Sequence, residues 1–206
     1  MEINDSGNMK IGITKMYEEI SELIGLKDYK IVNPYNEKVD CDLLIISKGY
    51  KDKVKRLNPN SEIFEVKSAT FRDLIETLED IKKLKIGDEN KINYSIKLLK
   101  YKEKKIKELA KNLLKDLNVE VNPITEFVKK IVEDLNLKIS ENGVLIVPDY
   151  FLKNQNYKNN KNNAKVIILK THNYNLRLIE RIEDRYLQII QKLRDFHERT
   201  YQRRSK

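Results

Sequence analysis

Polar side chains stand at the ends of four short apolar segments in the first half of the chain, at 10–14, 30–34, 41–47 and 62–67. Three of these ends carry a lysine beside a hydroxyl group, and two lead into predicted helices, whose free backbone N–H groups attract anions. Open α/β sheets bind ligands beyond the carboxyl ends of their strands, so the sequence predicts a phosphate or carboxylate site there. The candidate residues are Thr14, Lys15, Asn33, Tyr35, Ser47, Lys48, Lys67, Ser68 and Thr70.

A structural interpretation of the same residues remains open. Ser68 and Thr70 directly precede a predicted helix, and Thr70 with Asp73 forms a capping-box-like start, which favours helix caps over ligand contacts. The three lysines are equally consistent with plain surface residues. The chain contains neither GxGxxG nor GxxxxGK[ST], so the familiar nucleotide-binding loops are not predicted.

Residues suited to catalysis do not assemble into a predicted set. Cys41 begins an apolar segment with no evident histidine or cationic partner, so we interpret it as an inert core residue. Asp40 and Asp42 flank it and mark the entry of a strand. His172 follows an apolar segment in KTHNYN, and His197 borders the apolar face of the last helix. Neither histidine completes a Ser-His-Asp or Cys-His arrangement, and whether the chain is an enzyme stays open.

Composition indicates a globular protein with a sizeable core. Of its 206 residues, 40% are hydrophobic and 35% are charged. No stretch approaches the ~18 apolar residues of a membrane helix, and no signal peptide is recognised, so we expect a cytoplasmic protein without a membrane partner. A single cysteine excludes an internal disulfide, and with two histidines we expect no transition-metal site built from protein side chains alone.

The net charge of +9 is confined to the end of the chain. Residues 1–152 contain 27 basic and 27 acidic side chains, whereas residues 153–206 contain 14 basic and 5 acidic ones. In a helix over the last segment, six cations fall within one arc: Arg177, Arg181, Arg185, Lys192, Arg199 and Arg203. Two interpretations remain open. The stripe binds nucleic-acid phosphates or an acidic protein, or it is a solvated face whose arginines pair with nearby carboxylates, as Arg177 with Glu180.

The same predicted helix has an apolar seam beside the stripe. Its residues follow alternating spacings of three and four, and they are Ile179, Ile182, Tyr186, Ile189, Leu193 and Phe196. We favour a seam that packs within the chain. A short coiled coil between two copies, which would make a homo-oligomer, is the alternative.

Apolar segments that alternate with helical patterns predict an α/β fold. We expect an N-terminal lobe over residues 1–90, with a parallel-type sheet and flanking helices. A long linking helix follows within 91–118. A smaller C-terminal α/β lobe over 119–206 ends in the long amphipathic helix, which carries the basic residues. The strand order is not predicted.

Local signals add detail to this layout. Gly25 is expected to end the first helix. Pro123 is expected in the first turn of another helix, where its missing N–H is tolerated. The turn at 141–143 predicts a hairpin or a strand on either side. Residues 153–165 are rich in Asn and Lys, and we expect a mobile surface loop there.

One family resemblance follows from the order of these segments. CDLLIIS, then IFEVKSATFRDLIETLEDIKKL, then a long helix near 98–117 resembles the helix-linked two-lobed receptors for metals and corrinoids, whose lobe design nitrogenase-component-like proteins share. The resemblance covers about residues 40–118 and rests on the pattern of elements, so no functional residue is carried over. It implies two lobes with a cleft between them and an intracellular role with a ligand or cofactor.

Three functional hypotheses follow. The first is a cytoplasmic binding or accessory protein for a small anionic or cofactor-like ligand held between two α/β lobes. The second is a nucleic-acid-associated protein that uses its basic end at 153–206. The third is an assembly subunit that docks on a partner through its last helix. The identity of any ligand or cofactor is not predicted.

Overall fold

The computed structural model describes residues 9–117, 119–153 and 166–204. The chain divides into two compact units. Unit 1 consists of residues 1–68 and 73–98, and unit 2 of residues 69–72 and 99–206. The Asn- and Lys-rich segment for which we expect a mobile loop lies, but for its first residue, outside the described residues.

Unit 1 contains a four-stranded sheet whose strands all run parallel. The strands are β1 (Ile11–Thr14), β2 (Lys30–Val32), β3 (Leu43–Ser47) and β4 (Glu62–Val66), in the order β2-β1-β3-β4. The apolar residues of β3 are buried, because a central strand of a parallel sheet is covered on both faces. The parallel sheet predicted for the N-terminal lobe is confirmed.

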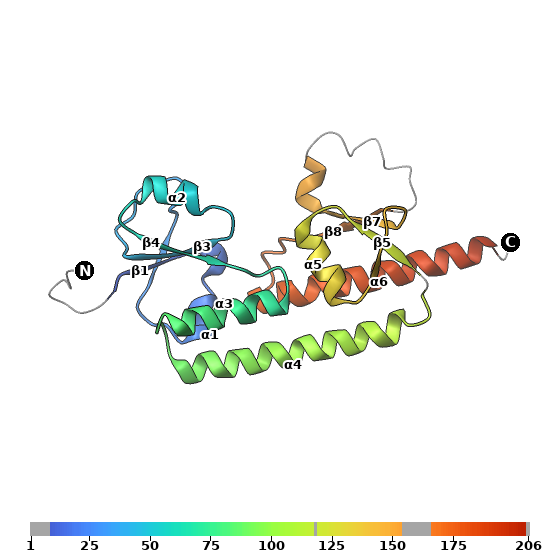
Figure 1. The fold of residues 1–206 in the computed structure, drawn as a ribbon, viewed down its shortest axis with the longest axis horizontal. Helices are drawn as coiled ribbons and strands as arrows, with labels where there is room; N and C mark the ends of the chain where they lie inside the picture. The colour runs from blue at the N-terminus through green and yellow to red at the C-terminus, as the bar shows by residue number, and fades with distance from the viewer. Residues whose placement is uncertain (1–8, 118, 154–165, 205–206) are drawn as a thin grey trace. The chain divides into compact units, whose positions relative to one another are not determined.

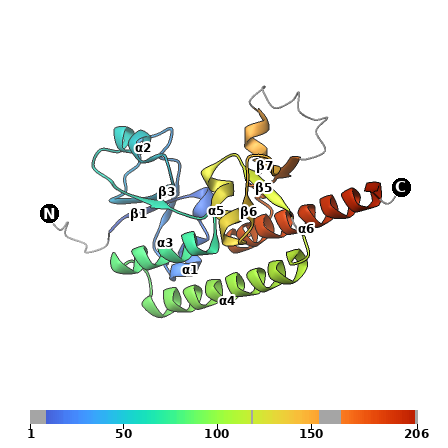
Figure 2. The ribbon, with the colours of Figure 1, turned by 45° about the vertical axis from the view of Figure 1, so that its right-hand side comes forward.

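Helices cover both faces of this sheet. A 3₁₀ turn, η1 (Lys15–Tyr17), and α1 (Ile20–Ile24) follow β1, α2 (Lys51–Leu57) joins β3 to β4, and α3 (Phe71–Lys83) follows β4. The α2 helix lies on one face, and α1 and α3 lie on the other (Figure 1, Figure 2). Gly25 ends α1 as predicted, with a left-handed φ of 65° that glycine adopts without strain.

A long helix, α4 (Glu89–Leu114), belongs to both units. Its residues up to Leu98 lie in unit 1, and those from Leu99 onward lie in unit 2. Its buried positions, Ile92, Ile96, Leu99, Ile106 and Ala110, recur every three to seven residues along one face. A long helix is present as expected, and it begins at Glu89 and ends at Leu114.

Unit 2 repeats the strand order of unit 1. Its strands are β5 (Glu120–Pro123), β6 (Lys138–Ile139), β7 (Val144–Pro148) and β8 (Val166–Leu169), all parallel, in the order β6-β5-β7-β8. The remaining elements are α5 (Glu126–Asp134), the 3₁₀ helix η2 (Asp149–Lys153) and α6 (Leu178–Arg204). None of the described helices is long and apolar enough to cross a membrane.

Two local predictions in unit 2 are corrected. At the turn at 141–143, the alternative of a strand on either side is confirmed by β6 and β7. The hairpin is wrong, because β5 lies between these two strands and both run parallel to it. Gly143 permits this arrangement, since a Cβ there would come within 2.6 Å of the Val121 backbone. Pro123 does not begin a helix. It is the last residue of β5, and Thr125 caps α5 by accepting a hydrogen bond from the N–H of Val128 at 3.3 Å.

The apolar seam of the last helix is part of the core of unit 2. Ile182, Tyr186, Ile189 and Leu193 are all 0% exposed. The chain itself covers these side chains, so the interpretation of the seam as intramolecular packing is confirmed.

Candidate polar site at the strand ends

The sheet of unit 1 reverses its strand order between β1 and β3, the position at which open α/β sheets bind ligands. Thr14 ends β1 and Ser47 ends β3. Thr14 is buried, and its hydroxyl has no hydrogen-bond partner among the described residues. Ser47 donates its hydroxyl to Met16 Sδ at 3.7 Å and its backbone N–H to the Tyr35 hydroxyl at 2.9 Å. Three predicted site residues thus lie at adjacent strand ends.

Two of the three predicted lysines at this edge are compensated by carboxylates of the chain. Lys15 pairs with Glu18, and the pairing raises the pKa of Lys15. Lys67 lies 3.5 Å from Glu76. Lys48 is exposed. The cationic character expected of this edge is therefore reduced.

The first turn of α2 already holds an anion that belongs to the protein. The backbone N–H groups of Gly49, Tyr50 and Lys51 donate to the same oxygen of the Glu65 carboxylate, at 2.7, 3.1 and 3.1 Å. The backbone N–H groups that we expect to bind a phosphate or carboxylate ligand therefore already donate to a carboxylate of the protein. The anion site expected after β3 is filled by Glu65.

The remaining predicted residues are distributed over both units. Ser68 shares a hydrogen bond of 3.0 Å with the Tyr17 hydroxyl in unit 1. Asn33 is exposed and accepts the N–H of Asn36 on its backbone carbonyl at 3.3 Å. Thr70 is buried and belongs to unit 2. Unit 1 by itself therefore offers hydroxyl groups rather than cations.

A second polar cluster lies at the strand ends of unit 2. Asp149 directly follows β7, at the corresponding reversal of strand order, and Thr171 follows the neighbouring β8. The Asp149 Oδ1 atom accepts the Thr171 hydroxyl at 2.6 Å, the Thr171 N–H at 3.2 Å and the Tyr150 N–H at 3.0 Å. Burial by itself raises the pKa of Asp149, but these hydrogen bonds outweigh it and hold that pKa below its usual value.

The cluster fixes the protonation of His172. The Thr171 hydroxyl lies 2.7 Å from His172 Nδ1, and its one hydrogen is already donated to Asp149. Nδ1 must therefore donate, which leaves the lone pair on Nε2. Burial, then the positive charge of Arg185, lowers the pKa of His172, Arg181 adds to this effect, and Asp149 opposes it. A neutral imidazole with an accepting Nε2 is the result.

Arg181 and Arg185 are buried beside this cluster and do not lie in an exposed stripe. They are 6% and 5% exposed, respectively. Arg185 donates from Nε and Nη2 to the Thr171 carbonyl, at 3.3 and 3.1 Å, and its guanidinium lies 5.1 Å from the centre of the Phe127 ring. Two cations of the predicted surface stripe thus place their charge near the strand ends of unit 2.

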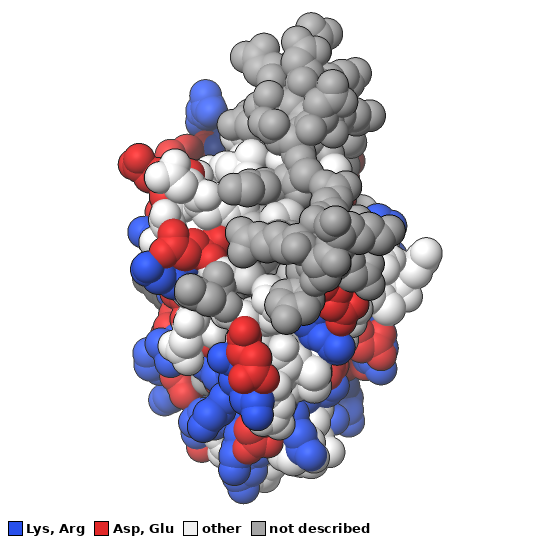
Figure 3. Space-filling model, turned by 90° about the vertical axis from the view of Figure 1, so that its right-hand side faces the viewer, with Lys and Arg blue, Asp and Glu red and all other residues white. Residues whose placement is uncertain are grey.

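The other described residues of the stripe, Lys192 and Arg177, differ in their surroundings. Lys192 is half-buried and donates to the Ile168 carbonyl, and burial lowers its pKa. Arg177 is exposed, and its backbone N–H donates to Glu180 at 2.9 Å. The side chains of Arg199 and Arg203 lie outside the described part of the chain. On the face shown in Figure 3, basic and acidic side chains are interspersed.

Sequence reasoning missed Asp149, Thr171 and the role of His172, although the needed signal was present. Each follows an apolar segment, as the residues proposed in unit 1 do. The strand-end rule requires strands that run parallel, and the sequence pattern at 141–143 leaves a hairpin open as one alternative. Because β7 and β8 run parallel, the same rule predicts a ligand site at their carboxyl ends.

The remaining chemically reactive groups are structural. Burial raises the pKa of the Cys41 thiol, which favours its unreactive protonated form. Asp40 forms a 2.8 Å ion pair with Lys10, and Asp42 accepts the Lys10 backbone N–H at 2.7 Å. Among the described residues, no three or more His, Cys, Asp and Glu side chains gather to hold a metal ion.

Solved structures with the same two-lobed fold include bacterial metal receptors. The substrate-binding protein FpvC of Pseudomonas aeruginosa, in complex with Mn²⁺, matches with a TM-score of 0.57 and 12% identity, over 91% of this chain and 99% of that one. The laminin-binding protein Lmb of Streptococcus agalactiae, which has adhesin and metal-transporting activity, matches with a TM-score of 0.58 and 13% identity, over 90% and 100% of the chains. The metal-receptor part of the expected fold resemblance is confirmed.

Sequence comparison identifies a family. The protein MJ0786 of Methanocaldococcus jannaschii is 68% identical over 190 residues, which is 92% of this chain and 97% of that protein. The model of the MJ0786 family N-terminal domain matches residues 12–105, and that of the C-terminal domain matches residues 117–198. The chain belongs to the MJ0786 family.

Proposed function

We propose that this chain is a binding protein for a small anion that also carries a hydrogen-bond donor. The observation that carries the proposal is the cluster at the strand ends of unit 2, where a neutral His172 lies beside two buried arginines. The fold supports a binding role, because the matching structures are receptors. The ligand class is argued from the residues of this chain.

The charge around His172 supports an anionic ligand. Arg185 and Arg181 are buried, so their positive charges are screened less than charges in water. After burial, which is the largest cause, Arg185 and Arg181 both contribute to the lowered pKa of His172, and Asp149 opposes them. The same potential attracts an anion and repels a cation, so the Mn²⁺ of FpvC is not carried over to this cluster.

The tautomer of His172 supports a ligand that carries a hydrogen-bond donor. An imidazole that donates from Nδ1 to Thr171 offers an acceptor at Nε2. A fully deprotonated anion presents acceptors alone and leaves Nε2 unmatched. Monohydrogen phosphate and hydroxy acids carry both a negative charge and a donor, so they match both features.

Unit 1 carries groups of a compatible kind at its own strand ends. Thr14 has a buried hydroxyl without a described partner, and such a group is costly unless a ligand or water satisfies it. Ser47 and Tyr35 lie at the same edge. Hydroxyl groups both donate and accept, so they suit a small polar molecule.

Thermal unfolding with chosen probes tests the proposal. Phosphate and malate at neutral pH should raise Tm, and fumarate, which lacks malate's hydroxyl, should raise it less. A ligand at 100 times its Kd adds about 2.7 kcal/mol. For a chain of this size, that corresponds to a Tm increase of roughly 5–10 °C. Mass spectrometry of the natively purified, then denatured protein should reveal a small anion.

Two histidine variants locate the effect. His172→Phe removes the Nε2 acceptor and keeps an aromatic ring beside Tyr150 and Tyr174. It should abolish the increase caused by phosphate or malate, whereas His197→Phe should leave it intact. The proposal is wrong if no probe changes Tm and no anion co-purifies. Equal effects of malate and fumarate would contradict the donor requirement.

A further inference from the structure

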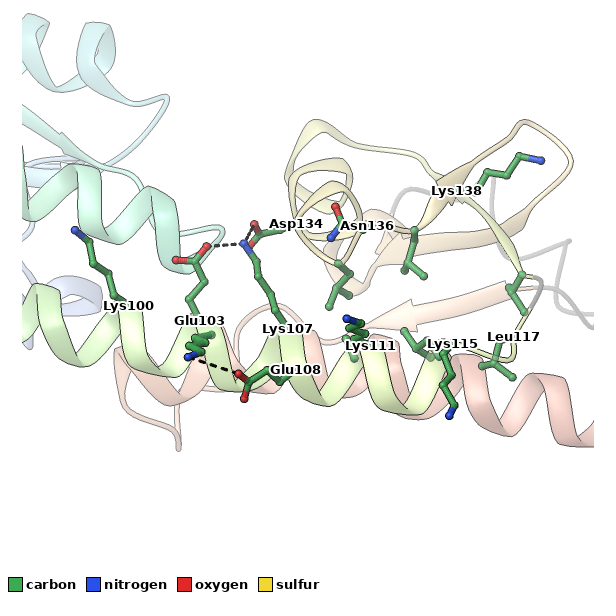
Figure 4. Close-up of a pocket in the computed structure, with 16 residues that line it drawn as sticks. Lys100, Glu103, Lys107, Glu108, Lys111, Lys115, Leu117, Asp134, Asn136 and Lys138 are labelled. Carbon is green, nitrogen blue, oxygen red and sulfur yellow. Dashed lines mark hydrogen bonds and ion pairs between the residues drawn. The ribbon is translucent and has the colours of Figure 1, made fainter.

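A pocket of about 720 Å³ lies in unit 2, away from the strand-end cluster. One wall is the second half of α4, and the other is the segment that contains Asp134 and Asn136, which links α5 to β6 (Figure 4). The volume falls in the range of small-molecule sites. None of its lining residues belongs to the cluster around His172.

The floor of this pocket is apolar near the end of α4. Leu114, Leu117 and Val119 contribute from one side, and Leu135 and Leu137 from the other. Leu135 is buried, and the others are half-buried. An apolar surface of this kind favours a ligand with a hydrocarbon or aromatic body, because covering it removes it from water.

The rim of the pocket carries an excess of positive charge. Three carboxylates line the pocket, and each forms an ion pair with a lysine. Lys107 lies 2.6 Å from both Glu103 and Asp134, and Lys104 lies 3.8 Å from Glu108 (Figure 4). The negative charge of the rim is therefore already matched within the protein.

Three lining lysines remain without an ion-pair partner among the described residues, namely Lys100, Lys111 and Lys115. Lys111 lies in the last turn of α4, and Lys115 directly follows the end of that helix at Leu114. Both line the pocket that contains the apolar floor. Two uncompensated ammonium groups beside an apolar surface form a complementary site for an anionic group on an apolar body.

We infer that this pocket binds a free anionic amphiphile, a small molecule with an apolar body and a carboxylate or phosphate end. The body lies against Leu114, Leu117 and Leu135, and the charged end lies between Lys111 and Lys115. The site goes beyond the strand-end function proposed above and does not depend on it.

Titration calorimetry with two probes of equal chain length tests this inference. Decanoate and decyl phosphate, below the concentrations at which they aggregate, should each bind with a stoichiometry of one. Decyl maltoside, which has the same chain and no charge, should bind at least about tenfold more weakly, a difference of about 1.4 kcal/mol. Acetate, which lacks the apolar body, should not bind.

A charge-reversed pair of variants supplies the control. Lys111→Glu with Lys115→Glu should weaken decanoate binding by at least about tenfold. Lys97→Glu with Lys105→Glu makes the same change in charge at exposed positions of α4 that do not line the pocket, and it should alter the affinity less than about twofold. Equal weakening by both pairs would overturn the assignment, as would no binding of either anionic probe.

Two further results separate the site from its alternatives. His172→Phe should leave decanoate binding unchanged, so this site and the strand-end site can fail independently. Co-sedimentation with phosphatidylglycerol vesicles, without binding of the monomeric probes, would show that a membrane surface is recognised and would overturn the inference of a free ligand.

Discussion

The tautomer of His172 is set by the hydrogen atom of the Thr171 hydroxyl group. The Thr171 hydroxyl has one proton and gives it to Asp149 at 2.6 Å, so the imidazole nitrogen facing it must donate. Burial, then the charges of Arg185 and Arg181, oppose protonation of the other nitrogen and lower the pKa of His172. The result is an acceptor in a positive potential. The ligand proposed for the strand ends of unit 2 must therefore carry a negative charge and a hydrogen-bond donor.

The lowered pKa of His172 makes stability depend on pH. The unfolded chain takes up the proton near pH 6.5, while the folded chain takes it up at a lower pH. Between these values the unfolded state binds more protons, so the free energy of unfolding falls as pH falls below about 6.5. We expect urea unfolding between pH 5 and 7 to show this slope, and His172→Gln to remove part of it.

The comparison between wild type and variant isolates this histidine. Asp149 also has a depressed pKa, but its contribution is lost only below about pH 4, where carboxyl groups titrate. It therefore does not enter the same window. An unchanged slope in His172→Gln would show that the histidine is not held neutral.

At the level of secondary structure, a partly buried polar chain connects three helices of unit 2. Tyr186 of α6 donates its hydroxyl to Asp134 Oδ2 of α5 at 2.5 Å. The other oxygen of Asp134 lies 2.6 Å from Lys107 of α4. Burial lowers the pKa of Lys107, but Asp134 and Glu103 outweigh it and raise that pKa. Burial, then Asp134, raises the pKa of Tyr186 far above its usual value, so the hydroxyl remains a donor.

Tyr186→Phe should lower the free energy of unfolding by about 1.5–3 kcal/mol, the range for a hydrogen bond to a charged group. The ring keeps its stacking on Phe71, whose centroid is 5.5 Å away, so the loss reports the hydroxyl. Tyr94→Phe, at a side chain 62% exposed, is the control and should change stability by less than about 0.5 kcal/mol. Urea denaturation measures both.

A double-mutant cycle tests whether the chain acts as a unit. Tyr186→Phe and Lys107→Met remove groups that share Asp134, so their effects should couple by more than about 0.5 kcal/mol. Strict additivity would mean that the two contacts are independent.

At the scale of the whole molecule, the two units share one strand order and are not simple consecutive pieces of sequence. Each sheet places its second strand, then its first, third and fourth, in spatial order. Residues 69–72 lie in unit 2, although unit 1 precedes and follows them, and α4 belongs to both units. A cut between the two regions matched by the family models would therefore separate Phe71 from Tyr186, against which it stacks.

The buried seam of α6 predicts how the molecule responds to a charge in its core. Ile189→Asp places an unpaired carboxylate at a fully buried position and should cost more than about 3 kcal/mol. Because the chain itself covers Ile189, the loss in Tm should be the same at protein concentrations tenfold apart. Leu187→Asp, on the same helix and 40% exposed, should have a small effect. A concentration-dependent mass that Ile189→Asp abolishes would instead indicate that a partner covers the seam.

The amino-acid pattern alone is enough to predict the local elements. The apolar run at β3 indicated a strand buried in a parallel sheet, and the alternating spacing in α6 identified Ile182, Ile189 and Leu193 as core. These signals are local, because the periodicity of a strand or a helix repeats within a few residues and records which face is buried. Of the predicted site, the chain order of strand ends was enough to bring Ser47 and Tyr35 together.

The burial and the partners of the charged residues depend on how distant parts of the chain pack together. Arg181 and Arg185 lie beside an apolar seam in sequence, and helical spacing cannot tell whether that flank faces water or the core; the packing of α6 in unit 2 buries both. Glu65 fills the amides of α2 from 14 to 16 residues away in sequence, and Asp149 meets Thr171 across 22 residues. Such pairings depend on strand order. Strand order follows from the packing of the whole sheet, and no local pattern encodes it.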